Sequence, residues 1–148
     1  ETHGLTMALK EMAEDMCHGA QIPLSFHGNA DHSGADPSRT VHLYRVVKEM
    51  LNNTIRHAHA TRCALTLAQQ DKQLMIVVED NGHGFAAGTL RMSSGSGLHN
   101  IRTRMELLNA RWVLCQPHGG GTRYEITVPL ISLTKRDGDF LQNKSAGG

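Results

Sequence analysis

Two apolar segments joined by the short polar sequence QDK constrain the fold of this chain more than any other feature. Residues 62–69 (RCALTLAQ) and 73–80 (QLMIVVED) alternate between apolar and polar positions or run continuously apolar, as strands do. Because a short turn joins strands that pair antiparallel, the two segments predict a β-hairpin. A second strand pair is predicted at residues 111–116 and 122–130, around the glycine-rich turn PHGGG.

Three helices are predicted around these strand pairs. Residues 5–16 place apolar side chains on one side at helical spacing, and residues 39–59 form a long helix with Ser38 as its expected N-cap. Residues 98–110 form the third helix, and QIPLSF is a short candidate strand. The order helix, strand, helix, hairpin, loop, helix, hairpin does not fit parallel βαβ alternation. It predicts an α+β fold, a two-layer sandwich with helices on one face of a mixed, mostly antiparallel sheet.

Length and charge limit the classes of function. A chain of 148 residues with 39% hydrophobic content fits one soluble domain, which we expect at residues 1–131. The polar residues 132–148 are expected to form a flexible tail. Fifteen basic against fourteen acidic side chains leave a formal charge of +1. This balance provides no field for nonspecific binding, so no nucleic-acid partner is expected.

Cysteine usage and the absence of long apolar runs favour a cytosolic setting. The three cysteines are far apart and lack CxxC spacing, which argues against a disulfide framework and against a zinc cluster. No apolar run approaches the roughly 20 residues that span a bilayer. Because the chain begins with Glu1, we expect a piece of a longer protein, whose missing part could hold a membrane segment.

The long helix has an apolar side and a polar side. At 100° per residue, one stripe is expected to pack on the sheet; it consists of Val41, Tyr44, Val47, Leu51, Ile55 and Ala58. Glu49, Asn53 and Arg56 form a row on the far side, with His57 near its edge. A solvated face explains this row as well as a ligand site does. The adjacent asparagines are poor helix formers and favour the ligand site.

A metal site built from the two histidines of this helix is disfavoured. His57 and His59 lie about 200° apart around one helix, so they cannot chelate the same metal ion unless the helix ends between them.

Two further stretches that contain glycines can each be explained in two ways, either by a bound ligand or by an ordinary turn or helix cap. In EDNGHGF, Asp80 ends an apolar strand, and Gly82 and Gly84 allow backbone conformations through which a ligand can approach closely. A plain Asp-Asn-Gly turn is the other explanation. In SSGSGLHNIR, Gly95 and Gly97 precede the third helix, whose free amides would form an anion site. A linker that ends in a helix cap is the alternative there.

A fourth stretch is GGGTRYEITVPL, in which Thr122 opens a strand after three glycines that turn chemistry alone could also explain. The four stretches, taken together and in this order, resemble the nucleotide-binding boxes of the GHKL (Bergerat-fold) ATPases, specifically the catalytic ATP-binding domain of bacterial sensor histidine kinases. LYRVVKEMLNNTIRHAHA resembles the N box, EDNGHGF the first glycine box, GSGLHNIRTRME the second and GGGTRYEITVPL the closing strand. The resemblance covers about residues 5–131. LYRVVKE, RHAHA and GLHNIRTR are similar to the two-component kinases of the nitrate-sensor type, which have a short ATP lid.

The resemblance implies a role for each motif residue. Asp80 would accept a hydrogen bond from the adenine amino group, and Thr122 would help through water. Asn53 would coordinate Mg²⁺ through its amide oxygen. Glu49 would be catalytic, ordering water on the metal or assisting deprotonation of the acceptor. Arg56 and His57 would contact phosphates, and Gly95, Gly97 and Leu98 would surround them with backbone amides. Gly82 and Gly84 complete the ATP-binding residues and would let the ligand approach closely.

The resemblance also implies the reaction and its partners. ATP and Mg²⁺ would bind, and the γ-phosphoryl group would pass to a histidine on a separate dimerisation domain of the same full-length protein. The receiver domain of a response regulator would take it next. The kinase would be a homodimer, with this domain in the cytoplasm and an anchor in the inner membrane as an option. The acceptor signature is missing here, so this chain should not phosphorylate its own histidines. An anti-sigma-factor serine kinase of the same fold and a nucleotide-binding regulatory module without kinase activity are the alternatives.

Overall fold

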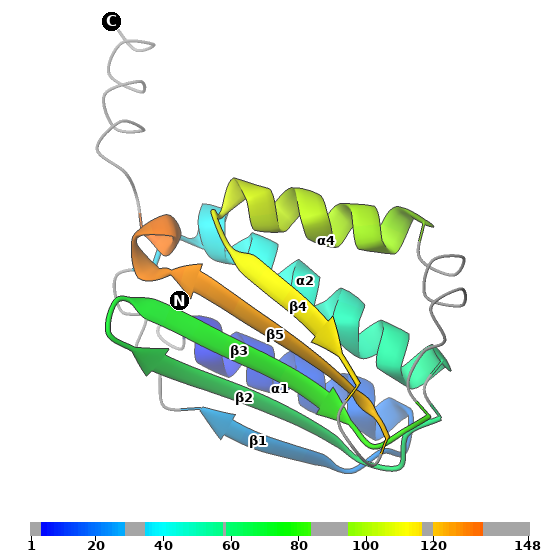
Figure 1. Cartoon of the computed structure of the whole chain (residues 1–148). Helices are drawn as coiled ribbons and strands as arrows, with labels where there is room; N and C mark the ends of the chain where they lie inside the picture. Colours follow the sequence, from blue (N-terminus) through cyan, green and yellow to red (C-terminus); the bar gives the residue numbers. More distant parts are fainter. Residues whose placement is uncertain (1–3, 29–34, 58, 84–94, 117–119, 135–148) are drawn as a thin grey trace, which may run out of the picture.

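The computed structural model describes residues 4–28, 35–57, 59–83, 95–116 and 120–134. Each predicted helix and strand has a counterpart in it (Figure 1). The elements are α1 (Gly4–Gly19), β1 (Leu24–Gly28), α2 (Pro37–His57), β2 (Cys63–Gln70), β3 (Gln73–Asp80), α4 (Gly95–Leu107), β4 (Arg111–Cys115), β5 (Thr122–Pro129) and the 3-10 turn η1 (Leu130–Leu133).

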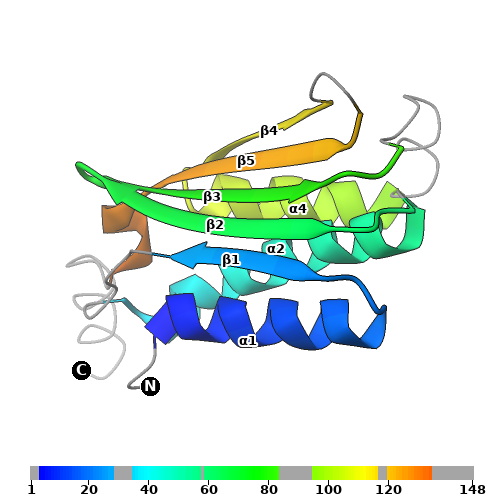
Figure 2. The ribbon, with the colours of Figure 1, turned by 90° about the horizontal axis from the view of Figure 1, so that it is seen from below.

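The strands form one mixed sheet in the order β1-β2-β3-β5-β4. β1 pairs parallel with β2, and the other three pairs are antiparallel. The helices α1, α2 and α4 all cover the same face of this sheet (Figure 2). The predicted α+β two-layer sandwich with a mostly antiparallel sheet is therefore confirmed.

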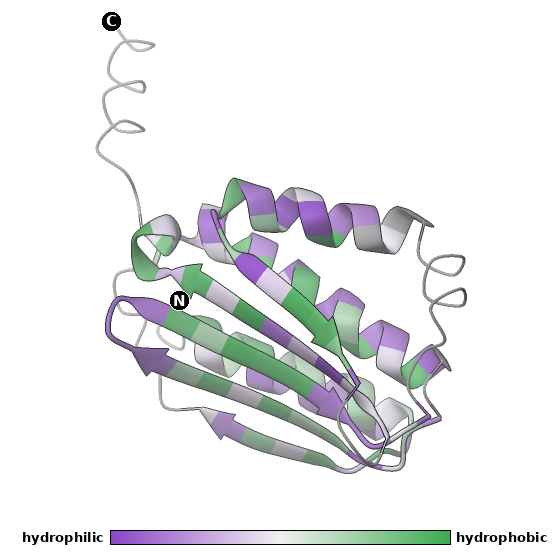
Figure 3. Ribbon diagram, viewed as in Figure 1, coloured by the Kyte–Doolittle hydropathy of each residue, from purple (hydrophilic) through white to green (hydrophobic). Residues whose placement is uncertain are grey.

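The core lies between the sheet and the three helices. Every second residue of β5 is buried, which is the period of a strand with one covered face. β3 is more continuously apolar, as Figure 3 also shows, because it lies at the centre of the sheet. α2 lies between α1 and α4 and contacts both.

The buried residues of α2 differ from the predicted apolar stripe because α2 also contacts α1 and α4. Its buried residues are Leu43, Val46, Val47, Met50, Leu51, Asn53 and Thr54. Val41 is 37% exposed, so its predicted place in the stripe on the sheet is wrong, and Tyr44 and Ile55 are only partly buried. The stripe is wider and turned because neighbouring helices also cover α2. Ala58 lies outside the described residues.

Two helix starts differ from the predictions. α2 begins at Pro37, and Asp36 replaces the predicted Ser38 as the cap: an Asp36 carboxylate oxygen accepts a hydrogen bond of 3.1 Å from the Ser38 amide. Proline is favoured at the first helical position because its missing amide would have no partner there. α4 begins at Gly95, three residues before the predicted start at Leu98.

The packed part of the chain continues through η1. Leu133 is buried in the core, and its carbonyl accepts a hydrogen bond of 2.7 Å from the Asp36 amide, just before α2. The domain boundary at residue 131 stays a prediction, and residues 135–148 lie outside the described part. None of the described helices is long and apolar enough to cross a membrane.

Candidate functional site

Four of the elements meet at one end of the molecule, to the right in Figure 1: the ends of α2 and β3 and the starts of β5 and α4. Asp80 is the last residue of β3 and Thr122 the first of β5, and the two are partners in the sheet register. Cys63 pairs with Asp80 on the other side. A hydrogen bond with Cys17 and burial raise the pKa of the Cys63 thiol, so Asp80 has a neutral neighbour there.

Asp80 is a nearly buried carboxylate held by two hydrogen bonds. It is 8% exposed, and its Oδ2 accepts a bond of 3.0 Å from the hydroxyl of Thr54 in α2. Its Oδ1 accepts a bond of 2.8 Å from the Gly82 amide. Each carboxylate oxygen has two lone pairs, so both oxygens keep acceptor capacity for a ligand. The two bonds orient the carboxylate from a helix and from its own loop.

Asn53 lies deeper than the predicted row of polar residues. It is 5% exposed, and its amide nitrogen is 3.4 Å from the hydroxyl of Tyr124 in β5. Burial raises the pKa of Tyr124, although the contact with Asn53 acts in the opposite direction, so the phenol stays protonated. The predicted outward position of Asn53 is wrong because Asn53 continues the buried line of Val46 and Met50 at helical spacing.

Gly121 allows β5 to start directly against the end of β3. Its φ is +97°, and a Cβ atom there would lie 2.2 Å from the carbonyl oxygen of Asp80. Only glycine adopts this conformation without strain and leaves room for that oxygen. The close approach sets Thr122 beside Asp80.

The side chain of Asn81 connects the loop that follows α2 to the end of β3 through hydrogen bonds. Its side-chain oxygen accepts hydrogen bonds of 2.9 Å from the amides of Thr61 and Arg62, and its nitrogen donates to the Thr61 hydroxyl at 2.8 Å. In the same place the rings of His59 and His83 are 5.7 Å apart. Asn81 therefore stabilises the loop that lies beside Asp80.

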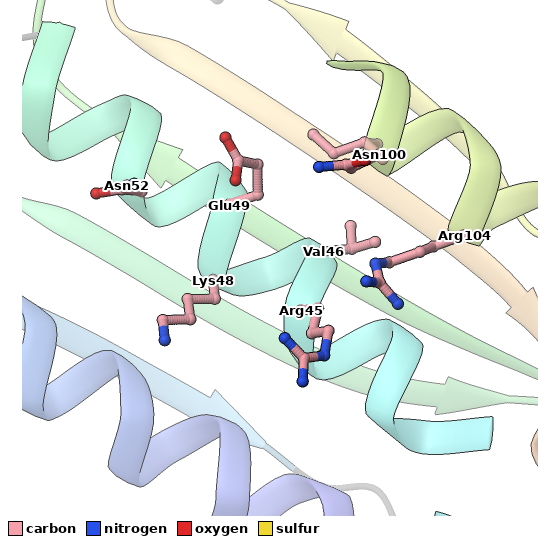
Figure 4. A pocket seen from close by; sticks show the side chains of 8 residues that line it. Arg45, Val46, Lys48, Glu49, Asn52, Asn100 and Arg104 are labelled. Atoms are coloured by element: carbon pink, nitrogen blue, oxygen red, sulfur yellow. The ribbon is translucent and has the colours of Figure 1, made fainter. Parts of the chain in front are cut away.

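Glu49 lies one turn before Asn53 and faces a different space. It lines a hollow of about 180 Å³ between α2 and α4, to which α4 contributes Asn100 and Arg104. Glu49 and Asn100 extend from opposite sides of the gap, and Arg104 extends toward α2 (Figure 4).

The other predicted residues are distributed as follows. Arg56 is exposed on the last turn of α2. His57 ends α2, and its side chain lies outside the described part of the chain, as does Gly84. Gly95 and Gly97 belong to the first turn of α4 instead of a loop before it, Leu98 lies in α4 as predicted, and Gly97 is buried. The structure thus links Asn53, Asp80, Gly82 and Thr122 through neighbouring backbone or hydrogen bonds, whereas Glu49 stands apart. The described residues contain no cluster of three or more His, Cys, Asp or Glu side chains that could hold a metal.

Sequence reasoning missed three residues that organise the site: Thr54, Asn81 and Tyr124. Thr54 follows Leu51 by three residues, a helical spacing that places its hydroxyl group on the buried side of α2. A hydroxyl group at such a position could have been recognised from the sequence. Tyr124 stands two residues after Thr122 and therefore on the same face of β5. Asn81 occupies an ordinary turn position, and nothing in the sequence indicates what its side chain holds.

Comparison with known protein families decides the family. Residues 38–132 match the model of the histidine kinase-, DNA gyrase B- and HSP90-like ATPases. The chain belongs to this ATPase family. The matched range begins in α2 and ends in η1, so this ATPase domain contains every residue of the network around Asp80.

Curated relatives of this ATPase domain include a histidine-protein kinase/phosphatase and a sensor protein. The chain is 36% identical over 99 residues to the signal transduction histidine-protein kinase/phosphatase UhpB of Salmonella typhimurium, covering 67% of this chain and 19% of UhpB. It is 32% identical over 98 residues to the sensor protein VraS of Staphylococcus epidermidis, covering 66% of this chain and 28% of VraS. The matched part of the chain therefore spans less than a third of the length of each of these relatives.

Solved structures support the fold. The histidine kinase domain of the blue-light activated histidine kinase from Erythrobacter litoralis matches with a TM-score of 0.70 at 21% identity, covering 87% of this chain and 62% of that chain. The mycobacterial sensor histidine kinase MprB matches with a TM-score of 0.65 at 18% identity, covering 84% of this chain and 93% of that one.

Proposed function

We propose that this chain is the ATP-binding catalytic domain of a sensor histidine kinase, which binds Mg-ATP and donates the γ-phosphoryl group to a histidine on a separate dimerisation domain. The observation that carries the proposal is the oriented, nearly buried Asp80 carboxylate at the meeting point of α2, β3 and β5. Family membership and the similarity to UhpB and VraS support it.

The chemistry of the buried groups fits adenine. The Thr122 hydroxyl is buried and has no hydrogen-bond partner among the described residues. A buried hydroxyl without a partner costs about 1–3 kcal/mol, so a ligand or a bridging water beside it would be stabilising. Asp80, its partner in the sheet, supplies the acceptor for the adenine amino group. Guanine would present a carbonyl oxygen to the same carboxylate and should bind more weakly.

The amide of Asn53 fits a Mg²⁺ ligand. Its nitrogen faces Tyr124, so its oxygen is the atom left for a hard cation. Bound Mg²⁺ would neutralise phosphate charge. Glu49 would assist at the acceptor from one turn away, and further phosphate contacts would come from Arg56, His57 and the first turn of α4 with Gly95, Gly97 and Leu98. Gly82 and Gly84 would let the nucleotide approach the backbone closely.

The rest of a longer protein would complete the reaction. It would provide the acceptor histidine, join two copies into a homodimer and attach this cytoplasmic domain to a membrane where an anchor is present. The receiver domain of a response regulator would then accept the phosphoryl group on an aspartate. Transfer would depend mainly on positioning and charge neutralisation.

A labelling experiment tests the proposed function. The purified chain is incubated with γ-labelled ATP, Mg²⁺ and a separately purified histidine-bearing dimerisation domain. We expect acid-labile label on the dimerisation domain and none on this chain. Acid-stable label on an anti-sigma antagonist supplied in its place would identify a serine kinase. ATP binding without labelling of either substrate would identify a regulatory module.

Replacing Glu49 with glutamine is expected to slow phosphoryl transfer while preserving ATP affinity. Loss of a group that assists proton transfer lowers rates by about 100-fold or more. The matched control is Glu106→Gln on the exposed side of α4, which should transfer at the normal rate. Initial rates of label transfer and a separate ATP titration measure the two effects. A normal rate in Glu49→Gln would remove this residue from catalysis.

Replacing Asn53 with alanine is expected to reduce the Mg²⁺ dependence of ATP binding by about tenfold, because the proposed oxygen ligand is lost. Asn52→Ala is the matched control one residue away, where a partly buried amide lines the hollow between α2 and α4. ATP titrations with and without Mg²⁺ measure the effect. An unaltered response to Mg²⁺ in Asn53→Ala would exclude Asn53 as a metal ligand.

A further inference from the structure

Two hollows lie along the surface between α2 and α4, here called the groove, and residues of both helices line each of them. The row on α2 consists of Ser38, His42, Arg45, Glu49 and Asn52, spaced by three or four residues. The row on α4 consists of Asn100, Arg104 and Leu107. The α2 row is about 20 Å long at 1.5 Å per residue. The groove is therefore long enough to hold several residues of a second chain.

Apolar residues line the hollow beside Glu49, and one contact between α2 and α4 crosses the groove. Val46 and Ile101, which line the hollow beside Glu49, are buried. Farther along, a second hollow of about 230 Å³ is lined by residues of both helices that include His42 and Leu107. Arg104 contacts His42 across the groove at 2.9 Å. The two hollows thus belong to one surface on which α2 and α4 are tied together.

Positive charge is concentrated along this groove. Arg45, Lys48 and Arg104 form no ion pair with any carboxylate in the part of the chain that the structure describes. Burial lowers the pKa of His42, and the nearby Arg104, Arg39 and Arg45 lower it further. His42 is therefore neutral near pH 7 and accepts from Arg104 without adding charge.

The distribution of charge along the chain makes this groove distinct. α2 contains Arg39, Arg45, Lys48 and Arg56 against Glu49 alone. α1 has the opposite balance, with Lys10 against Glu11, Glu14 and Asp15. The formal charge of +1 thus conceals a basic groove on one side of the molecule.

We propose that the groove between α2 and α4 is a docking surface for an acidic, amphipathic segment of a protein partner. Unpaired cations on both walls complement carboxylates, and such complementarity guides association and fixes orientation. Val41 and Leu107, which are 37% and 54% exposed, provide apolar contacts beside the cations. The exposed apolar residues and Glu49 in the wall favour a peptide over the phosphates of a nucleic acid.

The position of Glu49 connects this surface with the proposed reaction. Glu49 lines the end of the groove nearest Asn53 and the start of α4, where the γ-phosphate of ATP would lie. A segment in the groove would point along α2 toward that end. The assignment of this segment to the region flanking the phosphoryl acceptor rests on the proposed function, whereas the binding of an acidic segment does not.

A labelled peptide tests the docking surface directly. The probe is a fluorescein-labelled helical peptide of about 16 residues, with glutamates on one face and leucines on the adjacent face; in the reference peptide, glutamine replaces every glutamate. Fluorescence anisotropy with the full chain measures affinity at low and at high salt. We expect the glutamate peptide to bind more tightly than the reference and to weaken as salt screens the charges.

Charge reversal on the groove provides the matched comparison. Arg45→Glu with Lys48→Glu should weaken peptide binding by about tenfold or more, since each reversal replaces an attraction with a repulsion. Lys72→Glu with Arg111→Glu changes the net charge equally on exposed residues outside the groove and should have little effect. Circular dichroism and a thermal melt establish that both double variants are folded.

The outcomes separate this proposal from the proposed function. Equal weakening in both double variants, equal binding of the two peptides, or tighter groove-dependent binding of a single-stranded oligonucleotide would overturn the docking surface. ATP affinity is measured on the same samples and should be unchanged in Arg45→Glu with Lys48→Glu. Absence of ATP binding in the unaltered chain would overturn the proposed function and leave the peptide result standing.

In transfer assays, the groove variant should raise KM for the dimerisation domain and leave kcat close to normal.

Discussion

ATP binding is expected to weaken about 10- to 100-fold when Asp80 is replaced with asparagine. A hydrogen bond to a charged acceptor contributes about 1.5–3 kcal/mol, and the amide that replaces the carboxylate can turn a donor toward the adenine amino group. The Thr54 and Gly82 bonds hold the carboxylate in one orientation, so the loss cannot be relieved by a simple rotation. Isothermal titration with ATP in the presence of Mg²⁺ measures the change.

The control for this substitution is Asp71→Asn in the turn between β2 and β3. Asp71 is exposed, so the same chemical change occurs away from the proposed pocket. The free energy of unfolding of Asp80→Asn is measured in parallel, because its contacts with Thr54 and Gly82 also change. A folded variant that binds ATP with normal affinity would rule out Asp80 as the adenine acceptor.

Replacing Gly121 with alanine should lower the free energy of unfolding by about 2–4 kcal/mol, the range of a strained backbone combined with a steric clash. The new Cβ atom would meet the Asp80 carbonyl oxygen, which is backbone and cannot rotate away. The start of β5 must then move, and Thr122 moves with it. Urea unfolding followed by circular dichroism measures the loss, and an ATP titration under native conditions should show weaker binding.

Gly19→Ala provides the comparison for this change. Gly19 ends α1, and a Cβ atom there would meet nothing within 4 Å. Equal stability of the two variants would show that β5 accommodates a side chain at residue 121, and the close approach would then have no energetic role.

The strands and helices could be predicted because their hydrophobic patterns agree with their final environments. β2 and β5 each bury alternate residues on the covered face of the sheet, so a period of two was readable. The patterns failed where tertiary packing decides the outcome. Val41 has the spacing of a buried residue but stays exposed, while Asn53 was placed on the solvent side and is buried beside Tyr124. A helix covered by two other helices has more than one buried side, which a single stripe cannot represent.

The sequence indicates which stretches of the chain form the candidate site, but it indicates few of the contacts between their residues. The motifs named Asp80 and Thr122 from segments far apart in the chain, and the sheet register makes them neighbours. The spacing of Thr54 indicates the buried side of α2, but its hydrogen bond to Asp80 depends on how α2 packs against β3. The charge of α2 and α4 was hidden in a nearly neutral total because α1 has the opposite sign. The net charge of a sequence sums over surfaces that lie on different sides of the folded molecule.

The position of β5 in the sheet has a consequence for how this domain forms. β5 comes last among the described strands but lies between β3 and β4, so the inner part of the sheet is completed by the last of these strands. Contacts between residues so distant in sequence form slowly, because a long loop must close before they give stability. Asp80 and Thr122 therefore remain apart until β5 has been synthesised. A nascent chain that lacks β5 has an open edge beside β3 and only half of the proposed adenine site, so ATP should stabilise only the domain that contains β5.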